Sequence, residues 1–182
     1  MINKSKKKME TNFIKLLKKK RLNKITVKEI CEKSHLNRGT FYNHYLDVFD
    51  LIQQIENNLI TDLEKKLSKY SSNELNENPL PIFKDLLSFF YKHAPIISIL
   101  LEKYDESLFQ KKIIDLFKTR ALNNWRISST NNIHYDYFLE YVIYGCLGII
   151  KKWLKNNCLE DPNSLALLLN NMVTKGTTFL ND

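Results

Sequence analysis

Residues 26–45 constrain the fold more than any other stretch of the chain, because they contain two helix starts close together. Thr26-Val-Lys-Glu29 is a capping box, in which the Thr26 hydroxyl accepts from the amide of residue 29 and the Glu29 carboxylate accepts from the amide of residue 26. The helical pattern breaks at residues 34–36, Ser-His-Leu, and Asn37 supplies a second N-cap. Two short helices joined by such a turn form the helix-turn-helix pattern.

The second of these helices, expected at residues 38–45, has one apolar and one polar face. Successive residues step by about 100°, so Phe41 and Tyr45 face inward while Gly39 and Asn43 point outward. An arginine can donate two hydrogen bonds to guanine, an asparagine can pair with adenine, and a glycine lets a backbone approach closely. Threonine, tyrosine and lysine side chains suit phosphate contacts. We therefore expect a surface for the DNA major groove made of Thr26, Lys28, Asn37, Arg38, Gly39, Thr40, Tyr42, Asn43 and His44.

The rest of the chain has the pattern of an all-α protein. Four Gly and four Pro among 182 residues leave few strand and turn signals. The pattern predicts helices at residues 4–20, 48–69, 80–93, 95–103, 106–127, 132–156 and 162–180, with Asp47 and Asp161 as N-caps. In the helix at 48–69 we expect one buried stripe of Phe49, Ile52, Ile55, Leu59, Leu63 and Leu67. Polar residues 70–79 form the expected connection between regions.

The positive charge is concentrated at one end of the chain. The formal net charge is +8, and residues 1–48 hold 13 Lys and Arg against 4 Asp and Glu, whereas residues 49–182 hold 15 against 16. Such asymmetry is typical of a polyanion-binding module joined to a near-neutral body, although a run of lysines also keeps a helix soluble. We expect two domains, a DNA-binding domain at residues 1–48 and a helical domain at residues 49–182, and the family resemblance described below implies a regulatory and dimerisation role for the second.

Residues 25–45, ITVKEICEKSHLNRGTFYNHY, resemble the DNA-binding domain of the TetR/AcrR family of bacterial transcriptional regulators. In that family the first of the two helices opens on Thr, and the recognition helix reads Arg-Gly-Thr-Phe/Leu-Tyr-x-His-Phe. The matching residues here, in the same order, are Thr26, Asn37, Arg38, Gly39, Thr40, Phe41, Tyr42, His44 and Tyr45. The resemblance implies a TetR-like fold of about nine helices, with a three-helix head followed by a helical ligand-binding and dimerisation domain.

Two positions depart from the family's pattern. His35 occupies the turn position where the family usually has Gly, and a positive φ there would strain it. Val48 stands where the family often carries a basic residue that meets a phosphate just before the fourth helix. Lys24, Lys28 or the lysines of the first helix are candidates to replace that contact.

Residues 145–154, Gly-Cys-Leu-Gly-Ile-Ile-Lys-Lys-Trp-Leu, followed by Asp161-Pro162, resemble the C-terminal domain of a TetR subgroup common in Gram-positive bacteria. In the family the last two helices of each protomer form a four-helix dimer interface. The resemblance implies a homodimer whose interface includes Gly145, Gly148, Ile149, Trp153, Leu165, Leu168, Leu169 and Met172.

A series of aromatic residues in the second domain is open to two interpretations. Core packing is the default, and a pocket for a small hydrophobic or aromatic ligand is the alternative. The candidate pocket residues are Phe89, His93, Tyr104, Phe117, Trp125, Tyr137, Tyr141 and Tyr144. An enclosed pocket of about 300 Å³ or more favours a ligand sensor, whereas a fully packed core favours a protein partner.

The sequence lacks the motifs of an enzyme, a metal site or a membrane protein. There is no Gly-rich phosphate loop, nucleophile elbow or HExxH motif, and no cofactor is expected. The three Cys are far apart without a CxxC pair, and His44 has no second ligand at metal-site spacing. No apolar run has the length of a membrane span or the form of a signal peptide, which predicts a cytoplasmic protein.

These patterns predict a DNA-binding protein, and the family resemblance implies a sequence-specific transcriptional regulator, a ligand-responsive repressor that acts as a homodimer on a palindromic operator in double-stranded DNA. One alternative is a DNA-binding adaptor or coactivator whose C-terminal domain binds a protein partner. Another is a generic polyanion or membrane-surface binder, which would show steep salt dependence and no sequence preference.

Overall fold

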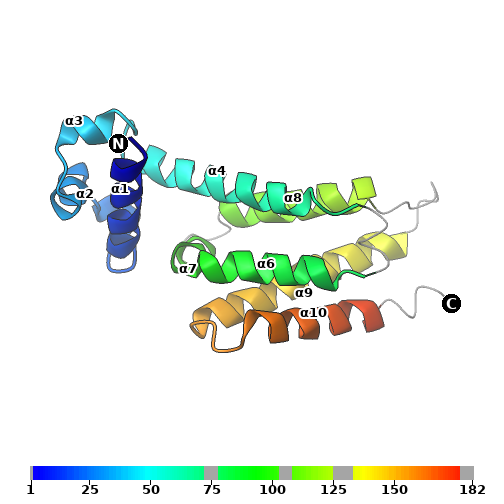
Figure 1. The fold of residues 1–182 in the computed structure, drawn as a ribbon. Helices are drawn as coiled ribbons and strands as arrows, with labels where there is room; N and C mark the ends of the chain where they lie inside the picture. The colour runs from blue at the N-terminus through cyan, green and yellow to red at the C-terminus, as the bar shows by residue number, and fades with distance from the viewer. Residues whose placement is uncertain (1, 72–77, 103–107, 125–132, 177–182) are drawn as a thin grey trace. The chain divides into compact units, whose positions relative to one another are not determined.

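The computed structural model describes residues 2–71, 78–102, 108–124 and 133–176, and every regular element within these ranges is a helix (Figure 1). These ranges hold nine α-helices and one short 3-10 helix, which confirms the predicted all-α, TetR-like fold class. The chain divides into two compact units, residues 1–61 and 62–182, so the division falls inside the helix α4 (Val48–Leu67). The functional division predicted between residues 48 and 49 stays a prediction.

The first unit contains α1 (Ile2–Leu17), the 3-10 helix η1 (Leu22–Lys24), α2 (Val27–Ser34), α3 (Arg38–Tyr42) and the first part of α4. α1 packs against α2, and α2 packs against α3. Buried side chains from these helices and the segment after α3 form the core: Met9, Phe13, Leu16, Leu17, Ile30, Phe41, Tyr45 and Leu51. The two short helices predicted around residues 26–45 are therefore present, and they lie on an apolar base.

Two of these helices are shorter than predicted. α1 ends at Leu17 because the amides of Lys19 and Lys20 both donate to the Leu16 carbonyl, at 2.9 Å. α3 ends at Tyr42 because the amides of residues 44 and 45 both donate to the Phe41 carbonyl, at 2.9 and 3.0 Å. The tightened turn after α3 still places Tyr45 in the core, where its side chain is 2% exposed.

The buried stripe of α4 differs from the prediction at its first member. Phe49 is 58% exposed, so its predicted burial is wrong. Val48 is buried instead, and a residue one position further along lies about 100° around the helix. The rest of the predicted stripe is buried: Ile52, Ile55, Leu59, Leu63 and Leu67.

The second unit contains the end of α4 followed by α6 (Leu80–Lys92), α7 (Ala94–Glu102), α8 (Leu108–Asn124), α9 (Ile133–Lys155) and α10 (Pro162–Gly176). α10 packs along α6, and α9 packs against both α7 and α8 (Figure 1). Asp161 begins α10 as predicted, because its carboxylate accepts from the amides of Asn163 and Ser164 at 2.9 and 3.1 Å. These long helices form their core from Leu, Ile and Phe side chains.

Candidate DNA-binding site

The start of α2 is fixed by the capping box that the sequence predicted. The amide of Glu29 donates to the Thr26 hydroxyl at 3.2 Å, and the Glu29 carboxylate accepts from the Thr26 amide at 3.1 Å. Lys20 pairs with the same carboxylate, and this pair, followed by the Thr26 amide, lowers the pKa of Glu29 below its usual value. Thr26 therefore has a structural role in holding α2, and its phosphate contact stays a prediction.

The turn between the two short helices contains a strained residue. His35 has φ 53° and ψ 47°, which is the left-handed region that favours glycine. The following amide, of Leu36, donates to the Cys31 carbonyl at 3.0 Å and closes the end of α2. The sequence identified His35 as the position where a positive φ would cause strain, and the structure confirms that φ.

The start of α3 is held by a cap that uses two of the predicted DNA-binding residues. The Asn37 side-chain oxygen accepts from the Thr40 amide at 2.7 Å and from the Thr40 hydroxyl at 2.9 Å. A five-residue helix has too few internal hydrogen bonds to form by itself, so this cap contributes directly to its geometry. Asn37 and Thr40 thus position the helix as well as border its outer face.

The outer face of α3 is polar and exposed, as the sequence predicted. Arg38, Gly39 and Asn43 are exposed, and Tyr42 is 57% exposed. Behind them Phe41 is fully buried, and its ring packs edge to face with Tyr42 at 5.6 Å between centroids. The face therefore projects from a buried apolar base.

Gly39 leaves space on this outer face that the protein itself does not need. A Cβ built there would meet only the side-chain oxygen of Asn37, at 3.4 Å, which is about ordinary van der Waals contact. Its φ is not in the left-handed region. The small side chain therefore relieves no crowding inside the unit and leaves room for another molecule.

The end of α3 is connected to α1 and α4 by a polar network that the sequence did not predict. The Gln54 amide donates to the His44 carbonyl at 3.2 Å and to Asp50 at 3.0 Å. The Tyr45 hydroxyl donates to Glu10 at 3.0 Å, and burial first, then Glu10, raises the pKa of Tyr45. The bonds to the His44 carbonyl and to Glu10 join residues 10 and 35 positions apart, so no local motif indicates them.

Two further predicted DNA-binding residues are Lys28 and His44. Lys28 is exposed on α2, with its ammonium group 3.8 Å from the Glu32 carboxylate. His44 is half-buried, and its ring centroid is 6.1 Å from that of Tyr45. Val48, where the family often has a basic residue, is buried at 7% exposure and offers no cation.

The candidate pocket residues of the second unit fall into three groups. Phe89 is buried in α6, Phe117 is half-buried, and the half-buried His93 ring lies 4.7 Å from that of Phe89, with its pKa lowered mainly by burial. Tyr104 and Trp125 lie outside the described residues. The structure places three tyrosines of α9 at the surface of the unit, opposite the buried Phe138, Leu139 and Ile143: Tyr137, Tyr141 and Tyr144.

The residues predicted for a dimer interface also separate by exposure. Trp153 is buried against Tyr91, and its indole N–H donates to the Glu160 carbonyl at 2.9 Å. Leu165 and Leu169 are likewise buried within the unit, so all three stabilise the core of a single chain. The members that remain accessible are Gly145, Gly148, Ile149, Leu168 and Met172.

Within the described part of the chain, no group of three or more His, Cys, Asp or Glu could hold a metal ion. None of the helices in the same ranges is long and apolar enough to cross a membrane.

Comparisons with known proteins agree with the all-helical fold. A TetR-type family model described as a transcriptional regulator C-terminal region matches residues 77–175, more than half of the chain. A curated relative, the uncharacterized HTH-type transcriptional regulator YxbF of Bacillus subtilis (strain 168), is 26% identical over 155 residues, which cover 83% of this chain and 40% of that protein. The chain therefore spans less than half the length of this relative.

Solved structures show the same fold at low sequence identity. The dihydroxyacetone kinase operon activator DhaS has a TM-score of 0.66 at 14% identity, covering 96% of this chain and 97% of its own. NalD of Pseudomonas aeruginosa, the secondary repressor of the MexAB-OprM multidrug efflux pump, has a TM-score of 0.62 at 20% identity, covering 96% and 95%. An activator and a repressor thus share this fold, so the fold alone does not give the direction of regulation.

Proposed function

Because the chain belongs to the TetR family of transcriptional regulators, we propose that it acts as a homodimer that represses transcription by occupying a palindromic operator. The two copies of α3 lie in successive major grooves about 34 Å apart, as two-fold symmetric helix-turn-helix proteins do. The family consists of regulators rather than enzymes. Its DNA partner gives the protein a cytoplasmic site of action.

The exposed face of α3 is the observation that carries this proposal. Arg38 presents a guanidinium fork at the first helical position, and Asn43 presents an amide at the other end. These two groups have the donor and acceptor patterns that read guanine and adenine. Gly39 between them lets the helix approach the base edges closely, since nothing inside the unit requires its small size.

The homodimer is supported by exposed apolar residues on α9 and α10. Leu168 and Met172 are 50% and 48% exposed on α10, and neither Gly145 nor Gly148 on α9 would bring a Cβ within 4 Å of another atom. Exposed apolar side chains that gather on one face mark interaction surfaces, and glycines allow a partner helix to approach. This face buries itself against the same face of a second copy.

The regulatory part of the proposal is a small hydrophobic or aromatic ligand in the second unit. Phe89, His93 and Phe117 are the candidate pocket residues with buried or half-buried side chains. Ligand binding weakens operator affinity through a coupling of about 1–3 kcal/mol.

A second candidate function, a DNA-binding adaptor, is favoured by one observation. Tyr137, Tyr141 and Tyr144 are 70%, 64% and 50% exposed, and accessible tyrosines are typical of protein-binding surfaces. In this function α9 binds a protein partner, and no small molecule is needed.

Fluorescence anisotropy with the DNA upstream of the protein's own gene, and with a scrambled duplex, tests operator reading. We expect the natural duplex to bind about 10³-fold more tightly or better. Arg38→Ala should weaken operator binding by about 10- to 100-fold and relax the preference at one base pair. Arg21→Ala is the matched control, because it removes the same charge from an exposed side chain of the same unit. Equal effects of the two substitutions would contradict base reading by α3.

A further inference from the structure

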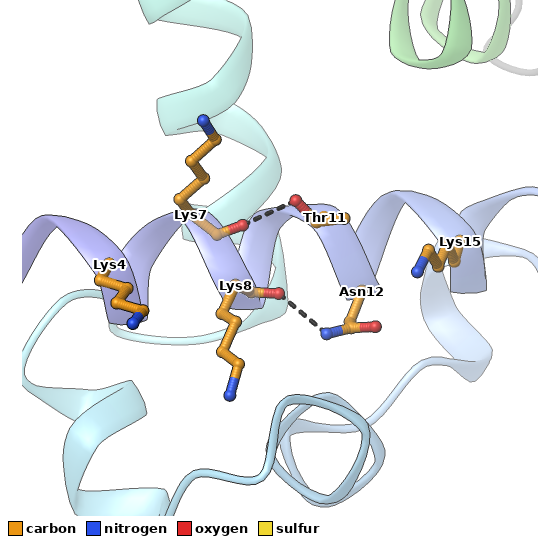
Figure 2. Close-up of a pocket in the computed structure, with 6 residues that line it drawn as sticks. All are labelled: Lys4, Lys7, Lys8, Thr11, Asn12 and Lys15. Atoms are coloured by element: carbon orange, nitrogen blue, oxygen red, sulfur yellow. Dashed lines mark hydrogen bonds between the residues drawn. The ribbon is translucent and has the colours of Figure 1, made fainter.

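The outward side of α1 carries a row of lysines around a shallow hollow of about 350 Å³ (Figure 2). Residues three, four and seven positions apart share one face of a helix, and this face lies opposite the buried Met9, Phe13 and Leu16. The residues that line the hollow are Lys4, Lys7, Lys8, Thr11, Asn12 and Lys15. We call its four lysines the α1 lysine face.

The ammonium groups are the side-chain donors of this hollow that are free to bind an anion. The Thr11 hydroxyl already donates to the Lys7 carbonyl at 2.8 Å, and the Asn12 amide donates to the Lys8 carbonyl at 3.0 Å (Figure 2). None of the four lysines has an ion-pair partner among the described residues. Four like charges on one helix face repel each other, so an anion bound there relieves that repulsion.

The first turns of α1 contact Tyr45, in the segment that follows α3. The Lys6 ammonium group is 5.6 Å from the centroid of the Tyr45 ring, and the Tyr45 hydroxyl donates to Glu10 at 3.0 Å. The hydroxyl of Ser34, the last residue of α2, donates to the Lys8 carbonyl at 3.4 Å. The backbone of Lys8 is therefore joined directly to the end of α2.

The chemistry of this face selects phosphate rather than bases or lipid. Lysines act as point charges, so they bind phosphate without reading sequence. The hollow has no apolar side chain in its lining, and the apolar side of α1 is buried in the core, so α1 has nothing to insert into a bilayer. Position 48, where the family often has a basic residue that contacts phosphate, is a buried valine in this chain.

We propose that the α1 lysine face binds the phosphate backbone of the DNA that α3 reads, and replaces the contact missing at Val48. This inference rests on the proposed DNA-binding function. Lys4, Lys7 and Lys8 make the contact, because they lie in the first two turns of α1, the end of the helix that Lys6 and Glu10 join to Tyr45. Lys15 contributes least, since it is about 16 Å further along the helix than Lys4.

The test replaces Lys4, Lys7 and Lys8 together by Gln and measures affinity for the upstream duplex and for a scrambled duplex across a salt series. The slope of log K for DNA association against log salt is negative, and each lost phosphate contact makes it less steep by about 0.9. We therefore expect the slope to become less steep by about 2–3 for each copy of the first unit that binds DNA. Affinity should fall by the same factor for both duplexes, about 10- to 100-fold at 0.15 M salt. Glutamine and lysine have similar helix propensities, and circular dichroism verifies that the fold is kept.

Two controls isolate the position of the charges. Lys84, Lys111 and Lys155 are exposed lysines of the second unit, so their joint replacement by Gln removes the same charge. This variant should keep the parental slope, because only lysines that contact phosphate release counterions, and the proposed contacts all lie in α1. Lys15→Gln alone should change the slope least among the α1 lysines.

Three results would overturn the inference. An unchanged slope in the α1 triple variant excludes phosphate contacts by this face, and a loss confined to the upstream duplex would indicate base reading instead. Lysine-dependent binding to vesicles of anionic phosphatidylserine, with DNA binding unchanged, would identify a membrane surface. Failure of operator reading is recognised separately by Arg38→Ala, because the slope on the scrambled duplex does not depend on sequence preference.

Discussion

The short helices of the first unit and the long helices of the second unit keep their geometry by different means. α2 and α3 have eight and five residues, whereas α9 and α10 have 23 and 15. The short helices rely on side-chain caps at Thr26 and Asn37 and on the polar network around Gln54. The long helices rely on apolar packing, and α9 and α10 leave further apolar residues exposed.

This difference shows which exposed surfaces are held in place by contacts within the chain and which are not. In the proposed function, the outer face of α3 that binds DNA is already fixed in the free protein, since its caps and its buried Phe41 lie within one chain. Pre-organisation of this kind lowers the entropic cost of binding. Leu168 and Met172 of α10 remain about half exposed, so their role depends on what covers them. The predictions below test this contrast.

The largest effect is expected from the base of the recognition helix. Phe41 is fully buried, so Phe41→Ala should lower the free energy of unfolding by about 3–5 kcal/mol. The adjacent Tyr42 is 57% exposed and makes one edge contact with Phe41. Tyr42→Ala should therefore lower the free energy of unfolding by only about 0.5–1 kcal/mol. Urea unfolding followed by circular dichroism measures both. A similar cost for the two variants would show that the base and the outer face of α3 are not distinct.

The sequence predicts the first unit well because its key contacts are local. The caps at Thr26, Asn37 and Asp47 each join residues three positions apart, so a short motif contains both partners. The bond from Gln54 to the carbonyl of His44 spans ten positions and depends on how α4 packs against the end of α3. No sequence pattern contains that geometry.

The second unit is less predictable because its helices are apolar on more than one side. The spacing of Tyr137, Tyr141 and Tyr144 shows that they share a face of α9, but not whether that face is buried. Trp153 and Leu169 are buried for a related reason, since contacts with other parts of the unit decide which side faces inward. Helix positions were therefore predictable here, whereas the buried face was not.

The next effect concerns the exposed face of the second unit. Leu168→Glu combined with Met172→Glu should weaken self-association by about 100-fold or more, because a charge in an apolar interface loses its hydration. Stability of the single chain should change little, since both side chains are about half exposed. Leu159→Glu is the control, because Leu159 is 81% exposed and lies outside the predicted interface. Sedimentation velocity measures the oligomeric state, and an unchanged state in the double variant would contradict the proposed dimer.

A smaller, stabilising effect is expected at the strained turns. His35→Gly should raise the free energy of unfolding by about 0.5–1 kcal/mol, because a left-handed conformation costs an L-residue about 1–2 kcal/mol and glycine's larger unfolded-state entropy offsets part of the gain. Cys158→Gly should behave similarly in the second unit, where φ is 54°, while Asn157→Gly should gain less, since asparagine tolerates this region. Thermal unfolding measures all three. A destabilised His35→Gly variant would mean that the imidazole makes a contact worth more than the strain.

The smallest effect is the pH dependence that Glu29 gives to the first unit. Lys20 and the Thr26 amide hold the pKa of Glu29 below its usual value of 4.5, so the folded state binds this proton less readily than the unfolded state. The contribution of Glu29 to stability is therefore present above pH 4.5 and is lost as the pH falls through the lower folded-state pKa. Glu29→Gln should remove this part of the acid sensitivity, while Glu32→Gln, which removes a charge from the same helix, should leave it. Because Lys20 is exposed, 1 M salt should weaken the effect in the parent, as seen in urea midpoints at pH 7 and pH 3. If the parent and Glu29→Gln lost stability equally on acidification, the capping box would hold α2 through the Thr26 hydroxyl, and the carboxylate charge would be dispensable.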